Sequence, residues 1–357
     1  MTTSDPAHPI LFIPGPVEVD AELREVMAMP LVGHRSQGFL AEVQAILPKL
    51  RRLFRTGAHV LFENVPATGL MEASIRNLVD ERVLHCTNGA FSERWAKISA
   101  ACGRQADTLA VEWGQGITPD ALRARLRGGP AYEAVTITHC ETSTGVLNPL
   151  RELAAVVREV QPDALVLADV VTSLAGAELE FDAWGIDCAF AGTQKCLALP
   201  PGLTVWALSE RAMAKARTVA GRGFLLDFPR AAESLAKGET LATPCVPLVF
   251  ALSRQLDRIE RETLPARWQR HPALRDATLA WCSEHGFAPF VADGWRSPTV
   301  TTVDASGRSV KDLIARAKAA GFTLGNGYGK LKDRTFRIGH MGDHPLPRLQ
   351  AFLAALA

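Results

Sequence analysis

The sequence lacks a strong net charge, a long apolar run and a paired cysteine motif, and each absence excludes a class of protein. Lysine and arginine total 39, and aspartate and glutamate total 38, which leaves a formal net charge of +1. That charge is too small for the broad electrostatic attraction that draws proteins to nucleic acids or anionic membranes. No stretch approaches the roughly 20 apolar residues that span a bilayer. We therefore expect no nucleic-acid partner and no membrane partner.

The cysteines and the first residues indicate a compartment. The seven cysteines are an odd number and form no C-x-x-C pair, which is typical of reduced thiols in the cytosol and gives no pattern for a metal. The first residues have neither the basic start nor the apolar centre of a secretory signal. We expect a cytoplasmic protein of ordinary globular composition, with 47% hydrophobic and 22% charged residues.

Short apolar segments alternate with amphipathic segments between about residues 60 and 210. The expected strands are residues 59–62, 82–86, 105–111, 134–138, 164–168, 188–191 and 203–208. The expected helices between them include residues 71–79, 91–102, 119–127 and 150–160, where apolar residues recur at helical spacing. This alternation predicts an α/β fold in which a mostly parallel sheet lies between layers of helices.

The pattern changes after residue 247. Helices are expected over residues 248–262, 271–285 and 309–320, and strands near residues 299–303 and 335–338. A chain of 357 residues is also long for a single hydrophobic core. We therefore expect a large domain of residues 15–250 and a smaller α+β domain of residues 251–357, which residues 1–14 join.

Two charged residues follow segments that are typical of buried strands. Asp169 ends the apolar run 164–168, and Lys195 follows the run 188–191. Because the carboxyl ends of parallel strands line the ligand crevice of an open sheet, we expect both side chains at that edge. An amine and a carboxylate placed there suit pyridoxal phosphate: the amine forms a Schiff base, and the carboxylate keeps the pyridine nitrogen protonated. The alternative, a surface lysine, is disfavoured by the apolar neighbours of Lys195.

Three further segments each leave two interpretations open. Thr68 and Gly69 open a helix after a strand, and they either cradle a phosphate with free N–H groups or form an ordinary helix cap. Phe91 follows an Asn-Gly turn, and it either stacks on a flat cofactor or anchors the next helix in the core. Arg337 lies within an apolar strand, and it either binds a substrate carboxylate or forms a structural ion pair.

A polar loop, residues 138–149, follows one of the expected strands and ends in turn signals. Such a loop can hydrogen-bond a ring hydroxyl and shape a substrate pocket. His139 in this loop is either a general base or a structural histidine. The neighbouring Cys140 and Glu141 do not complete a metal site with it, because adjacent strand residues point to opposite faces.

Taken in this order, the segments resemble the class V branch of the fold type I pyridoxal-phosphate enzymes, especially the alanine/serine–glyoxylate aminotransferases. The likeness spans nearly the whole chain, and its most specific pieces are residues 141–147, 169–174 and 193–195. The resemblance implies that Lys195 forms the internal aldimine and moves protons, and that Asp169 pairs with the pyridine nitrogen. The other residues that it assigns to pyridoxal 5'-phosphate are Ala67, Thr68, Gly69 and Gln194 at the phosphate, Phe91 and Val171 against the ring, and Thr142 at the ring hydroxyl.

The resemblance also implies a substrate clamp and a dimer. Arg337 would hold the α-carboxylate, and the protein would be a homodimer with active sites at the interface. Thr243 matches a threonine that reaches the phosphate site of the partner subunit. One departure is Pro66, because relatives usually have a Ser/Gly-rich run at residues 64–67. Proline has no N–H group, so we expect the set of phosphate donors to differ here.

The implied reaction is transfer of the amino group of a small L-amino acid, of the alanine or serine type, to a 2-oxo acid such as glyoxylate or pyruvate. The alternative is a phosphoserine aminotransferase in which His34 and Arg35, helped by Arg222, bind the substrate phosphate.

Other activities find less support. A cysteine desulfurase or lyase is a minor alternative, because Gln194 and Phe91 stand where desulfurases usually carry histidines, and Cys282 lies within a helical pattern. A nicotinamide-dependent oxidoreductase would rest on the glycine-rich run 325–329, which does not follow a first strand and lacks the G-x-G-x-x-G spacing.

Overall fold

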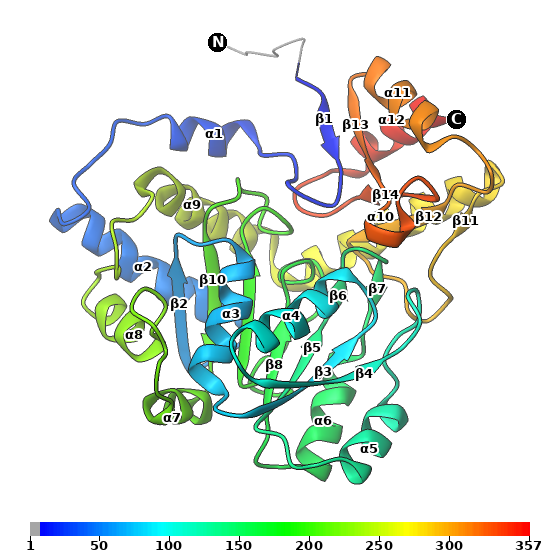
Figure 1. The fold of residues 1–357 in the computed structure, drawn as a ribbon. Helices are drawn as coiled ribbons and strands as arrows, with labels where there is room; N and C mark the ends of the chain where they lie inside the picture. The colour runs from blue at the N-terminus through cyan, green and yellow to red at the C-terminus, as the bar shows by residue number, and fades with distance from the viewer. Residues whose placement is uncertain (1–7) are drawn as a thin grey trace.

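The computed structural model describes residues 8–357, which form two main sheets (Figure 1). The larger sheet has seven strands in the order β2-β10-β9-β8-β5-β3-β4. These strands are β2 (His59–Glu63), β3 (Arg82–Thr87), β4 (Gln105–Ala110), β5 (Ala134–Thr138), β8 (Leu165–Asp169), β9 (Cys188–Gly192) and β10 (Thr204–Leu208). Neighbouring strands run parallel except at β10, which is antiparallel to β2 and β9. The seven predicted strands are confirmed to within one residue at each end.

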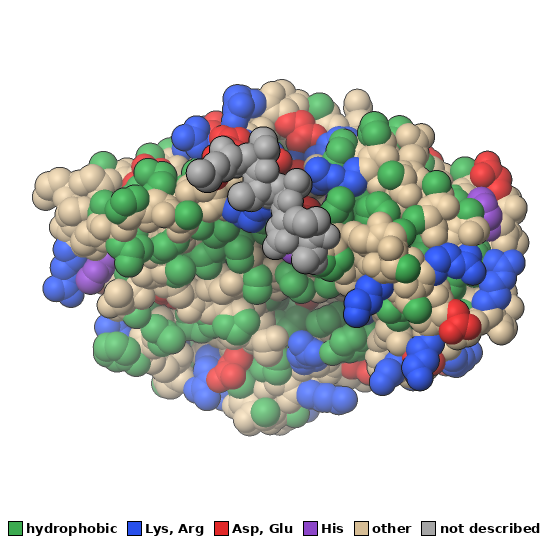
Figure 2. Space-filling view, turned by 90° about the horizontal axis from the view of Figure 1, so that it is seen from above, with side chains coloured by type: hydrophobic (Ala, Val, Ile, Leu, Met, Phe, Trp, Pro, Cys, Tyr) green, Lys and Arg blue, Asp and Glu red, His purple; other side chains and the backbone are tan. Residues whose placement is uncertain are grey.

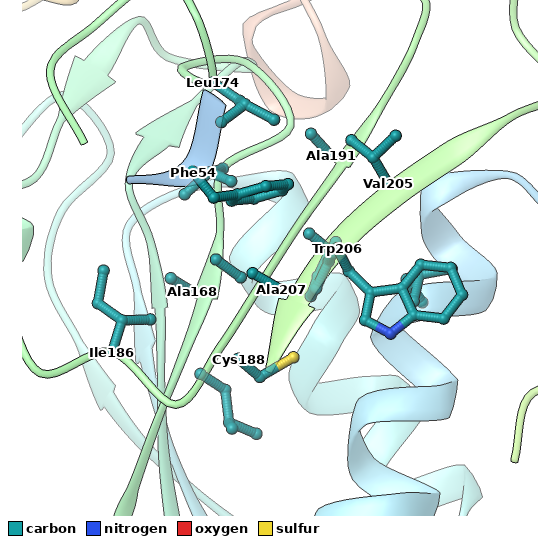
Figure 3. Packing of buried hydrophobic residues seen from close by; sticks show 14 of the residues in the cluster. Phe54, Ala168, Leu174, Ile186, Cys188, Ala191, Val205, Trp206 and Ala207 are labelled. Carbon is teal, nitrogen blue, oxygen red and sulfur yellow. The ribbon is translucent and has the colours of Figure 1, made fainter. Parts of the chain in front are cut away.

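Helices cover the larger sheet because its central strands are apolar on both faces. Every residue of β5, β8, β9 and β10 is buried. The covering helices are α2 (Gln37–Phe54), α3 (Ala67–Leu78), α4 (Ala90–Ala101), α5 (Pro119–Gly128), α6 (Leu150–Val160), α7 (Glu210–Thr218) and α8 (Phe228–Ala236). Figure 3 shows the packing: Phe54 of α2 lies beside Leu174 and Ala191, whereas Trp206 points to the other side of the strands. The α/β class predicted from the alternation is confirmed.

The smaller sheet has the order β1-β13-β14-β12-β11. Its strands are β1 (Ile10–Phe12), β11 (Ala288–Pro289), β12 (Val300–Asp304), β13 (Phe322–Asn326) and β14 (Thr335–Gly339), and its helices are α10 (Leu264–Glu284), α11 (Val310–Ala319) and α12 (Leu346–Leu356). β1 runs parallel to β13, with Ile10 opposite Phe322. The Phe12 ring stacks on Phe352 of α12, with ring centroids 4.2 Å apart, so the N-terminal strand belongs to the core of the smaller sheet. Strands β1 and β13 had no counterpart in the sequence prediction.

Two long helices connect the sheets. α9 (Val246–Glu262) packs on α2 and on α1 (Ala21–Met27), and it also contacts α10. The prediction placed the start of the next helix at residue 271, but α10 begins at Leu264. The boundary lies at Thr263, whose backbone has a φ of 68° and whose hydroxyl accepts a hydrogen bond from the Ala266 N–H. A positive φ at a β-branched residue interrupts a helix, so one long helical segment becomes two.

For the domain limits we retain the proposed division at residue 250, with residues 1–14 joined to the second part. Residues 1–7 of that part lie outside the described residues. None of the helices within residues 8–357 combines the length and the apolar character that crossing a membrane requires.

Candidate active site

Two adjacent strands bring Asp169 and the turn that carries Lys195 to the same edge of the larger sheet. β8 and β9 run parallel, and Asp169 at the end of β8 lies opposite Phe190 of β9. The negative charge of Asp169 acts on the Lys195 amine and favours its protonated form. The strand ends therefore meet where the sequence places them, at the carboxyl edge of the sheet.

Lys195 is buried, and only 8% of its surface is exposed. Its Nζ donates a hydrogen bond to the carbonyl oxygen of Pro14, which follows β1 of the smaller sheet. Gly15 has a φ of +116°, and a Cβ there would lie 2.8 Å from the Lys195 Cδ, so only glycine fits against the lysine. Burial, followed by the charge of Arg337, lowers the pKa of Lys195 to about 8. About a tenth of the amine is therefore neutral and nucleophilic at pH 7, a far larger share than for an ordinary lysine.

Asp169 is a buried carboxylate with little compensation. The Val171 N–H donates to its Oδ1 at 2.9 Å, and no lysine, arginine or histidine among residues 8–357 forms a salt bridge with it. Burial raises its pKa to about 7, and the Val171 hydrogen bond offsets only part of that effect. A carboxylate in this state is suited to a cationic partner that residues 8–357 do not provide.

A second buried carboxylate, Glu141, orients Phe91 and was not assigned a role from the sequence. Its Oε2 accepts hydrogen bonds from the Phe91 N–H at 3.1 Å and the Ser92 N–H at 2.9 Å, at the start of α4. Its Oε1 accepts from the Ser143 hydroxyl at 2.7 Å. A negative charge at a helix N-terminus is favourable, so Glu141 fixes the helix that carries Phe91. The only sequence signal for this role was its place in the polar loop.

Helix α3 begins at Ala67, and within its first turn the Gly69 N–H donates to the Pro66 carbonyl at 2.7 Å. No side chain caps that turn, and no acidic residue lies within it. Thr68 is exposed and Gly69 is half-buried, while the N-cap position is taken by Pro66. Backbone N–H groups at such a helix start can bind a phosphate.

The remaining residues predicted for the cofactor lie around these groups. The Thr142 hydroxyl hydrogen-bonds the Thr172 hydroxyl. Val171 lies two residues after Asp169, the last residue of β8. Gln194 directly precedes Lys195 and is half-buried. Thr243 is exposed, and its carbonyl oxygen accepts a hydrogen bond from Asn64 Nδ2 at 3.3 Å within the same chain, just before α3.

Arg337 lies on β14 of the smaller sheet and faces the same region. Its Nε donates to the Asn326 carbonyl at 2.9 Å, and its Nη1 donates to the Thr142 carbonyl at 3.2 Å. Burial lowers its pKa to about 10, and no carboxylate among residues 8–357 forms a salt bridge with it. Of the two interpretations left open by the sequence, the structural ion pair is not formed within residues 8–357, and the binding of a substrate carboxylate stays a prediction.

The cations predicted for a substrate phosphate are not at this edge within one chain. His34 is half-buried and Arg35 is exposed, on the segment between α1 and α2. No hydrogen bond or salt bridge within the described chain joins either of them to Lys195. Arg222 is already paired, because its Nε donates to Asp227 Oδ2 at 2.9 Å.

His139 is buried against Trp184, with ring centroids 6.1 Å apart. Burial lowers its pKa to about 4, so the imidazole stays neutral. Next to it, the Cys140 thiol donates to the Ser297 hydroxyl. Within residues 8–357 no cluster of three or more His, Cys, Asp or Glu side chains is arranged to hold a metal.

Behind the Lys195 turn lies a second group of buried charges, which we call the junction cluster: Arg267, Arg270, Glu262 and Asp343. Arg267 is 2% exposed and donates to Glu262 at 2.6 Å and to Asp343 at 2.7 Å. Its Nη2 also donates to the Cys196 carbonyl at 2.7 Å, so a residue of α10 holds the peptide next to Lys195. From the sequence alone, Arg267 is only an arginine between two expected helices.

Comparisons with known proteins agree with this geometry. The family model described as "Aminotransferase class-V" matches residues 79–318. The small subunit of a soluble hydrogenase from Synechococcus sp. is 35% identical over 93% of this chain and 88% of that protein. A serine–glyoxylate aminotransferase from Methylorubrum extorquens is 29% identical over 96% of this chain and 88% of that protein. The crystal structure of an alanine–glyoxylate aminotransferase from Nostoc sp. superposes with a TM-score of 0.92 at 29% identity, covering 98% of this chain and 94% of that one.

Proposed function

The chain belongs to the class V aminotransferases, and from this premise we propose that it is a pyridoxal-phosphate enzyme for a small L-amino acid. The amino group of a donor of the alanine or serine type would pass to a 2-oxo acid such as glyoxylate or pyruvate. The observation that carries this proposal is the meeting of the buried Lys195 and Asp169 with the half-buried Arg337, none of which forms an ion pair within residues 8–357. Relatives named as serine– and alanine–glyoxylate aminotransferases support the substrate class.

The side chains present fit pyridoxal phosphate. Asp169 has a raised pKa and no cationic partner, as expected of a carboxylate that meets a pyridine nitrogen. The uncapped first turn of α3 would bind the phosphate through Thr68 and Gly69, with Ala67, Gln194 and Thr243 around it. The ring would lie between Phe91 and Val171, with Thr142 at its hydroxyl. When bound, this cofactor supplies an electron sink for the pair of electrons left when the Cα proton of an amino acid is removed.

The residues of the chain have separate tasks. When the cofactor is bound, the Lys195 amine would hold it, and the same amine would move the proton from the substrate Cα. A pKa of about 8 would allow this amine both to accept and to release that proton near neutral pH. Arg337 would hold the carboxylate, which the amino acid and the oxo acid share. Asp169 would face the pyridine nitrogen and favour its protonated form.

We propose a homodimer with shared active sites in the cytosol. Two exposed apolar segments support the dimer: Met29, Leu31 and Val32, and Phe224 and Leu225. Leu31 and Phe224 have exposed fractions of 73% and 74%, and exposed apolar groups of this kind mark interaction surfaces. Figure 2 shows hydrophobic side chains gathered over the left and centre of one face, with charged side chains more frequent toward the right edge. The free cysteines support the cytosol.

The desulfurase alternative has little structural support. That reaction needs a mobile thiolate, but Cys282 is fully buried in α10, and burial raises its pKa to about 12. The phosphoserine alternative needs His34 and Arg35 at the substrate, which only a partner subunit could bring about.

The absorption spectrum of the purified protein tests the proposal. We expect a yellow protein whose visible band is lost on addition of L-alanine or L-serine and returns with pyruvate or glyoxylate. D-alanine, which presents the Cα proton on the wrong side of the lysine, is the control and should change nothing. Loss of the band fastest with O-phospho-L-serine would establish the phosphoserine alternative. A protein that stays colourless after incubation with pyridoxal phosphate would overturn the cofactor assignment.

A further inference from the structure

The glycine-rich run at residues 325–329 includes the end of β13 and the start of the turn that leads to β14, and it carries Tyr328. The turn is tightly closed, because the Gly327 N–H donates to the Thr335 carbonyl at 2.8 Å and a Cβ on Gly327 would lie 2.1 Å from the Leu331 carbonyl oxygen. The glycine at position 327 is therefore required by a close backbone approach rather than by a bound nucleotide. The turn presents its one aromatic side chain to the larger sheet.

Tyr328 contacts three residues near the catalytic lysine. Its ring stacks on Phe91, with centroids 5.4 Å apart and an interplanar angle of 26°. Its hydroxyl accepts a hydrogen bond from Arg94 Nη2 at 2.9 Å. The Arg337 guanidinium carbon lies 5.5 Å from the centre of the same ring. One phenol thus bridges the residue expected against the cofactor ring and the residue expected at the substrate carboxylate.

Arg94 ties Phe91 and Tyr328 together. The Arg94 guanidinium carbon lies 4.8 Å from the centre of the Phe91 ring, and its Nη2 donates to the Tyr328 hydroxyl. Phe91, Arg94 and Tyr328 therefore form one packed group beside Arg337.

The turn is also held against the larger sheet. The Lys330 ammonium lies 4.4 Å from the centre of the Trp113 ring, and the Trp113 Nε1–H donates to Glu93 at 2.7 Å. Arg94 and Glu93 both belong to α4. Tyr328 is therefore fixed at its hydroxyl and through its turn, so its ring forms a rigid surface rather than a mobile one.

We propose that Tyr328 is a specificity-determining residue that limits the size of the donor side chain. This inference rests on the proposed function, because it takes the substrate carboxylate to lie at Arg337. The side chain of an amino acid leaves the same Cα as its carboxylate, so a group bound at Arg337 and stacked near Phe91 places its side chain beside the Tyr328 ring. A methyl or hydroxymethyl group fits beside a fixed phenol, and a longer side chain meets it.

Replacement of Tyr328 tests the proposal through a ratio of rates. The rate constants for loss of the cofactor's visible band would be measured with L-alanine, L-2-aminobutyrate and L-methionine, in wild type, Tyr328→Ala and Tyr328→Phe. We expect Tyr328→Ala to raise the methionine-to-alanine ratio of kcat/KM on the order of 10- to 100-fold, the size of effect that one or two methylene groups have in a pocket. Tyr328→Phe keeps the ring and should leave the ratio within about threefold. Lys332→Ala, an exposed residue just beyond the turn, is the matched control and should behave as wild type.

A binding measurement keeps the test decisive if an alanine variant folds poorly or turns over slowly. Calorimetry would compare pyruvate with 4-methyl-2-oxopentanoate, whose carboxylates are the same and whose side chains differ in size. We expect wild type to favour pyruvate and Tyr328→Leu to lose most of that preference. An unchanged ratio in both measurements would overturn the role of Tyr328. A wild-type protein that transaminates no amino acid would instead overturn the proposed function, while the oxo-acid affinities would still decide whether Tyr328 selects by size.

Discussion

The structure contains two groups of buried charge that behave in opposite ways. We call Lys195, Asp169 and Arg337 the sheet-end cluster, in contrast to the junction cluster around Arg267. In the sheet-end cluster burial dominates: the pKa of Asp169 is raised, and the pKa values of Lys195 and Arg337 are lowered. In the junction cluster burial acts in the same directions, but it is outweighed by the opposite charges in contact. There the pKa of Arg267 is raised, and that of Asp343 is lowered.

This difference separates a ligand site from a structural element. Burying a charge without a partner is costly, and such a group persists in a fold when a ligand compensates for it or when its chemistry needs it. A buried charge with a complete set of partners holds segments together instead. By this criterion the sheet-end cluster binds ligands, and the junction cluster joins α10 to the Lys195 turn.

The largest effect is expected from Lys195→Ala. Removal of the amine takes away the nucleophile and the proton carrier together, so turnover should fall by at least about 10³-fold. Because Lys195 has no ion pair, the fold should remain. Steady-state kinetics and circular dichroism measure the two properties. Normal turnover in a folded variant would contradict the mechanism.

Arg267→Met would break the paired cluster. Loss of the arginine removes one partner from Glu262 and one from Asp343, which keep Arg270 and Arg258, and it leaves the Cys196 carbonyl without its donor. Removal of one member of a buried ion pair costs up to about 3–5 kcal/mol of the free energy of unfolding. Urea unfolding measures this cost. Arg258→Met is the matched control, because Arg258 is more exposed and pairs with Asp20, Glu22 and Asp343; it should cost about 1 kcal/mol or less. Equal losses of unfolding free energy in the two variants would show that the buried ion pairs of Arg267 contribute no more than the more exposed ion pairs of Arg258.

The pH dependence of the unfolding free energy of Asp169→Asn would test whether the Asp169 carboxylate is unpaired in the fold. In the unfolded chain this carboxyl ionises near its ordinary pKa of 3.8, whereas in the fold it ionises near 7. The unfolded state therefore holds fewer protons between pH 4 and 7, and stability falls as pH rises across that window. The asparagine variant lacks this titration, so its stability relative to wild type should rise by up to about 4 kcal/mol from pH 4 to pH 7.

The measurement is urea unfolding of both cofactor-free proteins at several pH values. Above about pH 7 the difference should be constant, and pyridoxal phosphate should reduce it by giving the wild-type carboxylate a cationic partner. A difference that does not vary with pH would show that Asp169 is already compensated in the fold.

Arg337→Ala should give the smallest of these effects, and it affects binding rather than stability. Loss of a charge-assisted contact with a carboxylate costs about 2 kcal/mol, which corresponds to a KM roughly 30-fold higher. The increase should be similar for the amino acid and the oxo acid, because both present the same carboxylate. Kinetics with each substrate varied in turn measure it, and Arg337→Lys should recover part of the loss. An increase for only one substrate would place the carboxylate elsewhere.

The sequence predicted the sheet-end cluster because its signals are local. Asp169 and the Lys195 turn each follow a continuous apolar segment, and burial on both faces allows such segments few arrangements other than a parallel sheet. The strands of the larger sheet followed from the same signal.

The contacts across the two sheets could not be predicted in this way. Arg267 and Cys196 are 71 residues apart, and Arg94 and Tyr328 are 234 residues apart. In each pair, the residues around one partner carry no pattern that identifies the other partner. Strand β13 was missed because it includes a glycine and is half exposed, so its apolar pattern is weak. Pairing with β1 and β14 defines it as a strand, and that pairing is a property of the finished fold.

The pairing of β1 with β13 also sets the order in which the protein can be completed during synthesis. Ile10 pairs with Phe322, so β1 cannot join its sheet before residue 322 has been made. At about 5–20 residues per second, the ribosome needs roughly 15–60 s to reach that residue. The larger sheet, including the turn of Lys195, is made well before then. Pro14 lies two residues after the end of β1, so its carbonyl reaches the lysine only when the last strands have been translated. A nascent chain thus carries its reactive amine for many seconds before the group that receives its hydrogen bond is in place.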